Sequence, residues 1–360
     1  MKKIESILMA NLLDSHKINY HPKEIANFLD GDLGAPIYVE ISPTGVCNHK
    51  CLFCNYNYLG HEGRFKKGKM LELVREFASM GVKSLVFAGN GEPTLHVDTF
   101  EAIQLAKSLG IDVALSTNGA ILKDKHFEIL AKNLTWIRFS FNAGSAENYA
   151  LVHQTDSADF DKVIENIKKL KETKDRLKSN ITIGSQCVLI PENKDFIIEH
   201  ANRLKSLGVD YFSVKHFYNH LHNEYSTDSN FLDENFLKIL ESESENISDK
   251  NFSFVVRSTQ NLSSTRIYNK CYGLEFIVFI DELGDVYTCF SHQHDKKTIH
   301  GNIFEKSFKE IWQSKEKKDA VNYINDCIDK NMCQPNCRHH QINNYLWNIK
   351  HPDIEHINFI

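Results

Sequence analysis

From residue 36 to residue 216, short apolar, β-branched runs alternate with amphipathic stretches, and this alternation limits the possible folds more than any other feature. The apolar runs read PIYVEIS, KSLVFAG, DVALSTN, WIRFSFN, ITIGSQCVLI and YFSVKHF, and the stretches between them carry apolar residues at helical spacing. Strand-helix-strand crossovers join parallel neighbours, so the sequence predicts an α/β fold with a parallel sheet. An open sheet and a curved, partial (β/α)6 TIM-like barrel both fit, and both place the active site at the carboxyl ends of the strands.

Composition excludes several classes of partner and compartment. The net charge is -5 and no basic block occurs, so we expect no nucleic-acid or membrane partner. No apolar run is long enough to span a bilayer, and residues 1–16 read as a short amphipathic helix without a cleavage site. We therefore expect a cytoplasmic protein, in which nine cysteines indicate metal or redox chemistry and not disulfides.

The chain divides by pattern into five segments. They are an N-terminal helical extension (1–35), the barrel (36–225), a polar bridge (226–265), a small α+β cysteine-bearing domain (266–345) and a C-terminal tail (346–360). In the small domain, FIVFIDELGDVYTCF predicts a β-hairpin that turns at DELGD, and residues 307–324 predict one helix.

The stretch CNHKCLFC places Cys47, Cys51 and Cys54 in the loop after the first predicted strand. Three thiolates can ligate zinc, although a structural zinc site needs a fourth ligand. They can also hold three irons of a 4Fe-4S cluster and leave the fourth iron open, which is the reading that the spacing favours.

The spacing CX3CXΦC, with Phe53 as the aromatic residue, resembles the signature of the radical S-adenosylmethionine (radical SAM) enzymes. GNGEP after the second strand resembles that family's GGEP motif, with Asn90 in place of the first glycine. STNG and SFNAGS follow the next two strands. The resemblance implies that the following residues contact the cofactor: Phe53, Gly89, Asn90, Gly91, Glu92, Ser116, Asn118, Ser140 and Asn142.

The resemblance also implies the chemistry. S-adenosylmethionine would chelate the open iron of a 4Fe-4S cluster held by the first three cysteines. An electron donor such as flavodoxin or ferredoxin would reduce the cluster, and the resulting 5'-deoxyadenosyl radical would abstract hydrogen from a substrate.

Five further cysteines, Cys271, Cys289, Cys327, Cys333 and Cys337, resemble the SPASM or twitch extension of radical SAM enzymes, which binds auxiliary 4Fe-4S clusters. Ile324 stands where the full SPASM pattern has a cysteine, so we expect one auxiliary cluster. Its expected ligands are Cys271, Cys289, Cys333 and Cys337, with Cys327 either replacing one of them or free. A zinc ribbon is the alternative, and we interpret His339 and His340 as neighbours of the site.

Other polar candidates lie on or after the last predicted strands. Cys187 is either a small core residue or, if it faces the barrel, a hydrogen donor to a substrate radical, as in an epimerase. Lys215, His216, Arg257 and Arg266 are candidates for binding a substrate phosphate or carboxylate.

Two enzyme hypotheses follow. One is oxidation or epimerisation of a small polyhydroxylated substrate such as a sugar, nucleotide sugar or aminocyclitol. We favour it because the 46 residues before Cys47 are too few for a typical domain that binds the leader of a peptide substrate. The other is maturation of a ribosomally made peptide or a protein side chain. A non-enzymatic iron-sulfur or zinc scaffold is a third class, and the GNGEP and STNG motifs argue against it.

Overall fold

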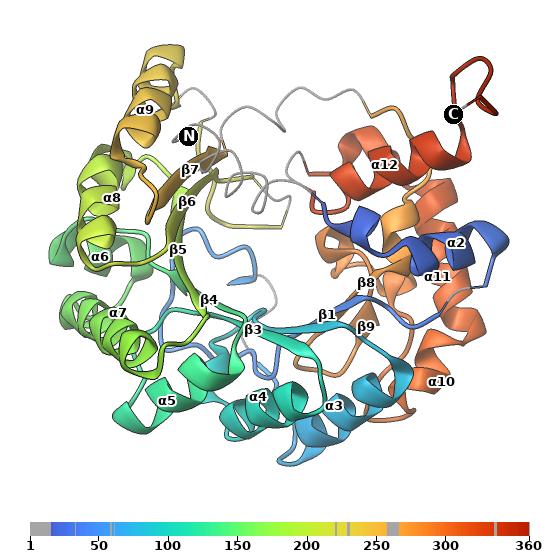
Figure 1. Cartoon of the computed structure of the whole chain (residues 1–360), viewed down its shortest axis with the longest axis horizontal. Coiled ribbons are helices and arrows are strands. Elements are labelled where there is room, and N and C mark those ends of the chain that lie inside the picture. Colours follow the sequence, from blue (N-terminus) through green and yellow to red (C-terminus); the bar gives the residue numbers. More distant parts are fainter. Residues whose placement is uncertain are drawn as a thin grey trace.

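A curved, nine-stranded sheet forms the centre of the computed structural model, which describes residues 16–32, 34–57, 60, 62–219, 222–228, 231–257, 266–334 and 337–359 (Figure 1). The strand order is β7-β6-β5-β4-β3-β2-β1-β8-β9. All neighbouring pairs are parallel except β8 with β9. The strands are β1 (Tyr38–Ile41), β2 (Ser84–Phe87), β3 (Asp112–Thr117), β4 (Trp136–Ser140), β5 (Thr182–Leu189), β6 (Tyr211–His216), β7 (Ser253–Arg257), β8 (Ile277–Ile280) and β9 (Val286–Tyr287).

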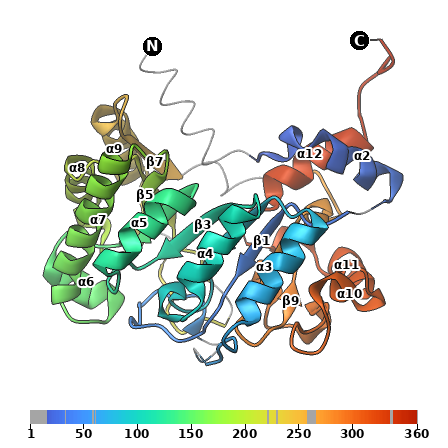
Figure 2. The ribbon, with the colours of Figure 1, turned by 60° about the horizontal axis from the view of Figure 1, so that its bottom comes forward.

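Helices cover the convex side of this sheet (Figures 1 and 2). Those of the barrel are α3 (Lys69–Met80), α4 (Thr99–Ser108), α5 (Asp124–Asn133), α6 (Ala146–His153), α7 (Ala158–Leu177), α8 (Ile197–Ser206) and α9 (Glu234–Ile247). The helices near the two ends of the chain are α2 (Pro22–Asp30), α10 (Phe308–Trp312), α11 (Lys315–Cys327) and α12 (His340–Lys350). Within the described residues, no helix is both long enough and apolar enough to cross a membrane.

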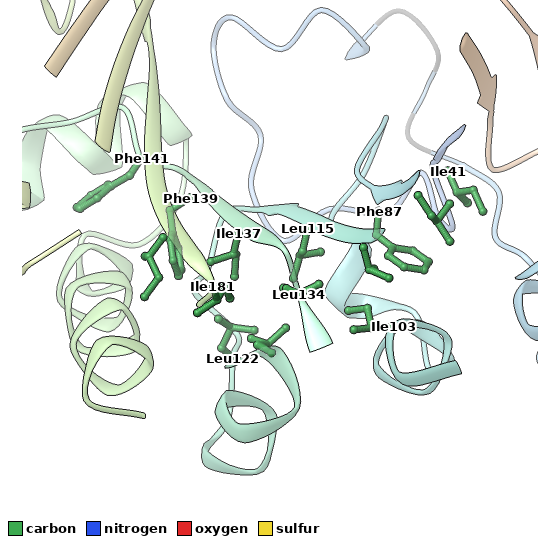
Figure 3. Packing of buried hydrophobic residues seen from close by; sticks show 14 of the residues in the cluster. Ile41, Phe87, Ile103, Leu115, Leu122, Leu134, Ile137, Phe139, Phe141 and Ile181 are labelled. Atoms are coloured by element: carbon green, nitrogen blue, oxygen red, sulfur yellow. The ribbon is translucent and has the colours of Figure 1, made fainter. Parts of the chain in front are cut away.

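The hydrophobic core lies between the sheet and these helices (Figure 3). Phe87, Leu115 and Phe139 on the strands pack there with Ile103 of α4 and Leu134 near the end of α5, and each is at most 5% exposed. Because successive strand side chains point to opposite faces, the intervening positions face the concave side. Polar residues occupy many of those positions, which leaves the inside of the curve available for a ligand.

The predicted parallel α/β architecture is confirmed, and so is the hairpin at DELGD, where Phe279 pairs with Tyr287. The predicted helix over 307–324 is interrupted, because α10 ends at Trp312 and Ser314 caps a second helix by accepting from the Lys317 backbone N–H.

Two other elements differ from the sequence prediction. The supposed polar bridge contains β7, which pairs with β6 and extends the barrel sheet. The hairpin strand β8 pairs with β1, so the cysteine-bearing segment shares its sheet with the barrel. The polar residues around β7 hid that strand, whereas β8 was expected and only its pairing with β1 was not, because backbone pairing depends on neighbours distant in sequence. The five-segment division therefore remains a prediction.

Helix α2 lies beside α12 in both views (Figures 1 and 2). Ile25 and Phe28 pack with Phe276 and Leu346 in a small apolar cluster. The amphipathic helix predicted over residues 1–16 lies, except for residue 16, outside the described part of the chain.

Candidate active site

The first three thiols lie in the loop that leaves the carboxyl end of β1. Burial raises the pKa of the Cys47 thiol to about 12. Burial, followed by the charges of Cys54 and Cys47, raises the pKa of Cys51 well above its usual value. Thiolates crowded in a poorly solvated loop need a strong positive charge beside them, and this donor set therefore fits a metal cluster.

Helix α6, which sequence periodicity did not predict, brings His153 to this loop. The Nδ1 atom of His153 lies 3.2 Å from the Sγ atom of Cys51, and its Nε2 atom lies 3.2 Å from the backbone nitrogen of Asn142. A backbone N–H can only donate, so Nε2 accepts and the proton sits on Nδ1. His153 is thus a neutral imidazole that donates to the Cys51 sulfur.

A second histidine, His49, approaches the same thiol. Ligand atoms of His49, Cys51 and His153 lie within 4.8 Å of one another, a set that would also suit a single metal ion. The His49 Nε2 atom lies 3.1 Å from Asp159. Burial lowers the pKa of both imidazoles, so both are neutral near pH 7. Geometry alone leaves the mononuclear and cluster alternatives open.

The GNGEP loop packs closely against the segment that leads to Cys47. Gly89 has φ = 109°, and a Cβ atom there would lie 2.3 Å from the Ser42 Cβ. A Cβ at Gly91 would lie 2.4 Å from the Thr44 carbonyl oxygen. Both positions therefore require glycine. Asn90, where the family has glycine, does not take a positive φ, which explains why this departure is tolerated.

The Glu92 carboxylate forms its hydrogen bonds with other residues of the protein. It accepts hydrogen bonds from the Thr94 backbone at 3.0 Å, the Thr117 hydroxyl at 2.7 Å and the Asn118 backbone at 2.7 Å. Its buried oxygens are therefore committed to holding the loop against the end of β3, and any role toward a cofactor passes through the residues it positions. The Asn118 amide in turn donates to the Asn48 side chain at 2.8 Å.

The remaining motif residues lie at the ends of β3 and β4. Ser116 lies directly across from Arg138, whose guanidinium is 3.5 Å from its hydroxyl. Ser140 ends β4 and is half-buried. Asn142 is buried, and its side-chain oxygen accepts from the Val188 backbone at 2.7 Å, so it braces β5 against the loop.

A cavity of about 810 Å³ occupies the concave side of the sheet. At the carboxyl ends of the strands it is lined by Phe53, Asn55 and Tyr56, and at the amino ends by Lys83 and Asp112. Its middle is lined by Tyr38, Glu40, Trp136, Arg138, Gln186, Val188, Lys215, His216, Arg257 and Arg338. This volume lies within the range of small-molecule sites.

Of the five candidates for hydrogen donation or substrate binding, Lys215, His216 and Arg257 line this cavity and the other two lie away from it. Cys187 is 0% exposed in the core on the helix side of β5, while its neighbours Gln186 and Val188 line the cavity. The hydrogen-donor hypothesis for Cys187 is therefore wrong, and its interpretation as a core residue holds. Strand alternation assigns the residues of β5 to two faces of the sheet but does not say which face points into the barrel. Arg266 also lies elsewhere, since its guanidinium donates to the carbonyl oxygens of Cys333 and Gln334.

Four of the five C-terminal cysteines come together. Burial raises the pKa of Cys289, with Cys337, Cys271 and Cys333 adding to the shift, so all four thiols share one site. Cys327, in contrast, is exposed at the end of α11.

Neighbouring side chains reach the sulfur atoms of this second group. The Asn343 amide donates to Cys271 Sγ at 3.1 Å, and the His339 Nδ1 atom lies 3.9 Å from Cys337 Sγ. His340 instead bonds Tyr268. Within the described residues, the second group thus offers four sulfur ligands for one cluster.

A buried carboxylate joins the β8–β9 hairpin to the GNGEP loop. Glu282, in the turn between β8 and β9, is 3% exposed. Its Oε2 atom accepts from the Ser42 hydroxyl at 2.9 Å and from the Asn90 side-chain amide at 2.8 Å. The SPASM-like hairpin therefore holds the GNGEP loop directly, a contact that no sequence motif signals.

Comparison with known protein families resolves the choice between a cluster and a single ion. The model of the radical SAM superfamily matches residues 41–204, and that of the SPASM iron-sulfur cluster-binding domain matches residues 271–339. Both cysteine groups fall inside these matches.

Two curated relatives carry the same activity name. A probable GTP 3',8-cyclase of Saccharolobus islandicus (strain M.14.25 / Kamchatka #1) is 33% identical over 169 residues, which cover 46% of this chain and 49% of the relative. The chain thus matches only about half of the first such relatives. The GTP 3',8-cyclase of Aquifex aeolicus (strain VF5) is 31% identical over 320 residues, covering 81% of this chain and 93% of the relative.

Solved structures share the fold at lower identity. Streptococcus suis SuiB bound to S-adenosylmethionine superposes with a TM-score of 0.66 at 19% identity, over 93% of this chain and 79% of SuiB. The enzyme anSMEcpe with bound AdoMet gives 0.59 at 20% identity, over 81% and 84% of the two chains.

Proposed function

This chain belongs to the radical SAM superfamily and carries a C-terminal SPASM iron-sulfur domain, and from that premise we propose that it oxidises a small polyhydroxylated molecule held in the barrel cavity. The family shows that it is an enzyme that uses S-adenosylmethionine and iron-sulfur clusters; the substrate and the reaction type are our proposals. The observation that carries them is the cavity of about 810 Å³, which is bounded by the sheet and the Cys47–Cys54 loop.

The lining of the cavity favours oxidation over epimerisation. An epimerase needs a hydrogen-atom donor beside the substrate radical, and no cysteine occurs among the described residues that line the cavity. Cys187, the sequence candidate for that role, points into the core on the other side of the sheet.

The residues of the first site would hold the cofactor and exclude water. Cys47, Cys51 and Cys54 would ligate a 4Fe-4S cluster, which together with S-adenosylmethionine supplies a 5'-deoxyadenosyl radical when reduced. The GNGEP backbone approaches the same loop, and Phe53 lies at the carboxyl end of the cavity, where it would cover the nucleoside. Ser116, Asn118, Ser140 and Asn142 border this end of the strands.

The second cysteine group would supply an electron acceptor. Cys271, Cys289, Cys333 and Cys337 are the ligands that we propose for one auxiliary 4Fe-4S cluster, with Cys327 free. Net oxidation of a substrate releases one electron beyond the abstracted hydrogen atom, and an auxiliary cluster is suited to accept it. A flavodoxin or ferredoxin would deliver the first electron.

The relatives bear on the substrate in two ways. Those named GTP 3',8-cyclase act, by that name, on a nucleotide whose ribose is polyhydroxylated, which keeps nucleotides within the proposed class and ring closure among the possible outcomes. Peptide modification is the competing proposal, because SuiB has been solved with the precursor peptide SuiA. That similarity, at 20% identity, concerns the fold alone.

Anaerobic reconstitution, iron counting and product analysis test the proposal. With S-adenosylmethionine and a reductant, the holoenzyme should form 5'-deoxyadenosine and hold about eight irons per chain, the number in two 4Fe-4S clusters. Small metabolites that pass an ultrafiltration membrane should increase 5'-deoxyadenosine formation, and the product should be oxidised by two electrons. No 5'-deoxyadenosine at all would refute the enzyme proposal, and stimulation by the peptide fraction alone would favour the maturase.

Serine variants test the auxiliary ligands. Cys333→Ser should lower the iron content of the holoenzyme by about four atoms, the content of one cluster, or leave a broken cluster with altered absorption. Cys327→Ser is the matched control, and it should retain about eight irons. Loss of iron in the Cys327 variant would show that the ligand set is wrong.

A further inference from the structure

Basic residues outnumber acidic residues in the lining of the barrel cavity. The described lining contains six of them (Lys17, Lys83, Arg138, Lys215, Arg257 and Arg338) and two acidic residues (Glu40 and Asp112). Glu40 is already offset, because its carboxylate accepts from the Arg338 guanidinium at 2.8 Å and from the Tyr38 hydroxyl at 2.7 Å. Asp112 lies exposed at the amino end of β3. The middle of the cavity therefore carries excess positive charge.

Lys215 shows the imbalance most clearly. Its ammonium group forms no hydrogen bond or ion pair with any residue that the structure describes. Arg257 is its direct cross-strand partner, and like charges facing each other on neighbouring strands repel. Burial and the charges of Arg138, Arg257 and Arg338 lower the pKa of Lys215 to about 7.

Arg138 adds a third charge from another strand. It lies on β4, and its guanidinium lies over the Trp136 ring at 5.4 Å. Among the described residues, its one hydrogen-bond contact is long, at 3.5 Å from the Ser116 hydroxyl. Strands β4, β6 and β7 thus each present one cation to the same cavity. Like charges gathered on the wall of one cavity attract an anionic ligand to it.

We infer that the cavity binds a substrate bearing a phosphate or diphosphate group, which Arg138, Lys215 and Arg257 clamp. A single carboxylate would neutralise one of the three cations, whereas a diphosphate carries enough charge and enough acceptor oxygens for all three. Guanidinium groups also match phosphate geometry through paired N–H donors. This inference rests on the proposed function, since it names the anchoring group of the same small-molecule substrate.

Calorimetric titration of the reconstituted holoenzyme with inorganic diphosphate tests the inference without turnover. Diphosphate should bind, and Lys215→Met and Arg257→Gln should each weaken it about 10- to 100-fold, as expected for losing a hydrogen bond to a charged group. Lys215→Arg should restore most of the affinity. The exposed rim residue Lys83 supplies the control, and Lys83→Met should change affinity less than about threefold because solvent screens its charge.

Malonate, a dicarboxylate of similar size, distinguishes the two kinds of anion. Binding of malonate as tight as that of diphosphate, or equal effects of Lys83→Met and Lys215→Met, would overturn the inference. Thermal unfolding provides a second readout, since Lys215→Met should raise the melting temperature of the ligand-free protein, and a fall would indicate a structural role instead. Formation of 5'-deoxyadenosine without diphosphate binding would refute the anion clamp and leave the proposed function intact.

Discussion

Replacing Glu282 tests whether the SPASM hairpin holds the cofactor loop. Its buried Oε2 atom accepts two hydrogen bonds, from Ser42 and from Asn90. Hydrogen bonds to a charged group contribute about 1.5–3 kcal/mol each, so Glu282→Ala removes about 3–6 kcal/mol. Part of this loss is offset, because the variant also removes a repulsion between two carboxylates. Burial, and next to it the charge of Glu282, raise the pKa of Asp281 to about 7. We expect a net loss of about 2–4 kcal/mol in the free energy of unfolding.

Glu282→Gln separates charge from shape. The glutamine oxygen can replace Oε2 and accept both bonds, so only charge assistance is lost and the expected cost is about 1–2 kcal/mol. Urea unfolding followed by tryptophan fluorescence measures both variants. The matched control is Glu305→Ala, at an exposed glutamate of the same segment without a side-chain bond, and it should lie within about 0.5 kcal/mol of the wild type.

A double-mutant cycle with Asn90→Ala provides the sharpest version of this test. Residues joined by a direct buried bond should show a coupling energy of about 1–3 kcal/mol. Because Asn90 belongs to the GNGEP loop, both single variants should also weaken binding of S-adenosylmethionine to the holoenzyme. A coupling energy near zero, or equal stability losses for Glu282→Ala and Glu305→Ala, would refute the proposed contact.

Three further variants test other parts of the site. His153→Phe removes the donor to Cys51 and should lower the midpoint potential of the first cluster by a few tens of millivolts, on the order expected for hydrogen bonds to cluster sulfurs, in an EPR-monitored redox titration. Gly91→Ala should prevent binding of S-adenosylmethionine or folding itself, because its methyl group would overlap the Thr44 carbonyl oxygen; normal calorimetric affinity would contradict the close approach of the two loops. Lys215 has its pKa lowered to about 7 in the folded protein, so the unfolded chain binds more protons above that pH. The wild-type free energy of unfolding should therefore rise by about 3–4 kcal/mol from pH 7 to pH 10, and Lys215→Met should abolish this rise, as measured by thermal unfolding at a series of pH values.

Local sequence patterns were sufficient to find the first site, because each of its parts is a short motif that directly follows a strand. Cys47, Cys51 and Cys54 follow β1, while GNGEP and STNG follow β2 and β3. In a parallel sheet all carboxyl ends meet at one edge, so the order of the motifs predicted their convergence. The glycines of GNGEP could also be interpreted in advance, because a close backbone approach excludes any side chain.

Residues that join the site from distant segments left no such pattern. Helix α6 buries Asn148 and His153 and exposes Leu151, so it lacks the apolar stripe that reveals an amphipathic helix. Its contact with Cys51 spans 102 positions in the chain. Glu282 likewise reaches Asn90 from 192 positions away. Both are single polar side chains, whose partners only the folded chain brings near.

The sequence by itself determined the parallel α/β architecture, the radical SAM and SPASM signatures and the three thiols of the first group, because periodicity and spacing are local properties. Tertiary structure alone decided that Cys187 faces the core, that Arg266 supports the Cys333 loop, and that Arg138, Lys215 and Arg257 share one cavity. Strand alternation assigns residues to two faces but cannot say which is concave. The curvature of the sheet settles that choice, because the helices bury one face in the core and leave the other to the ligand.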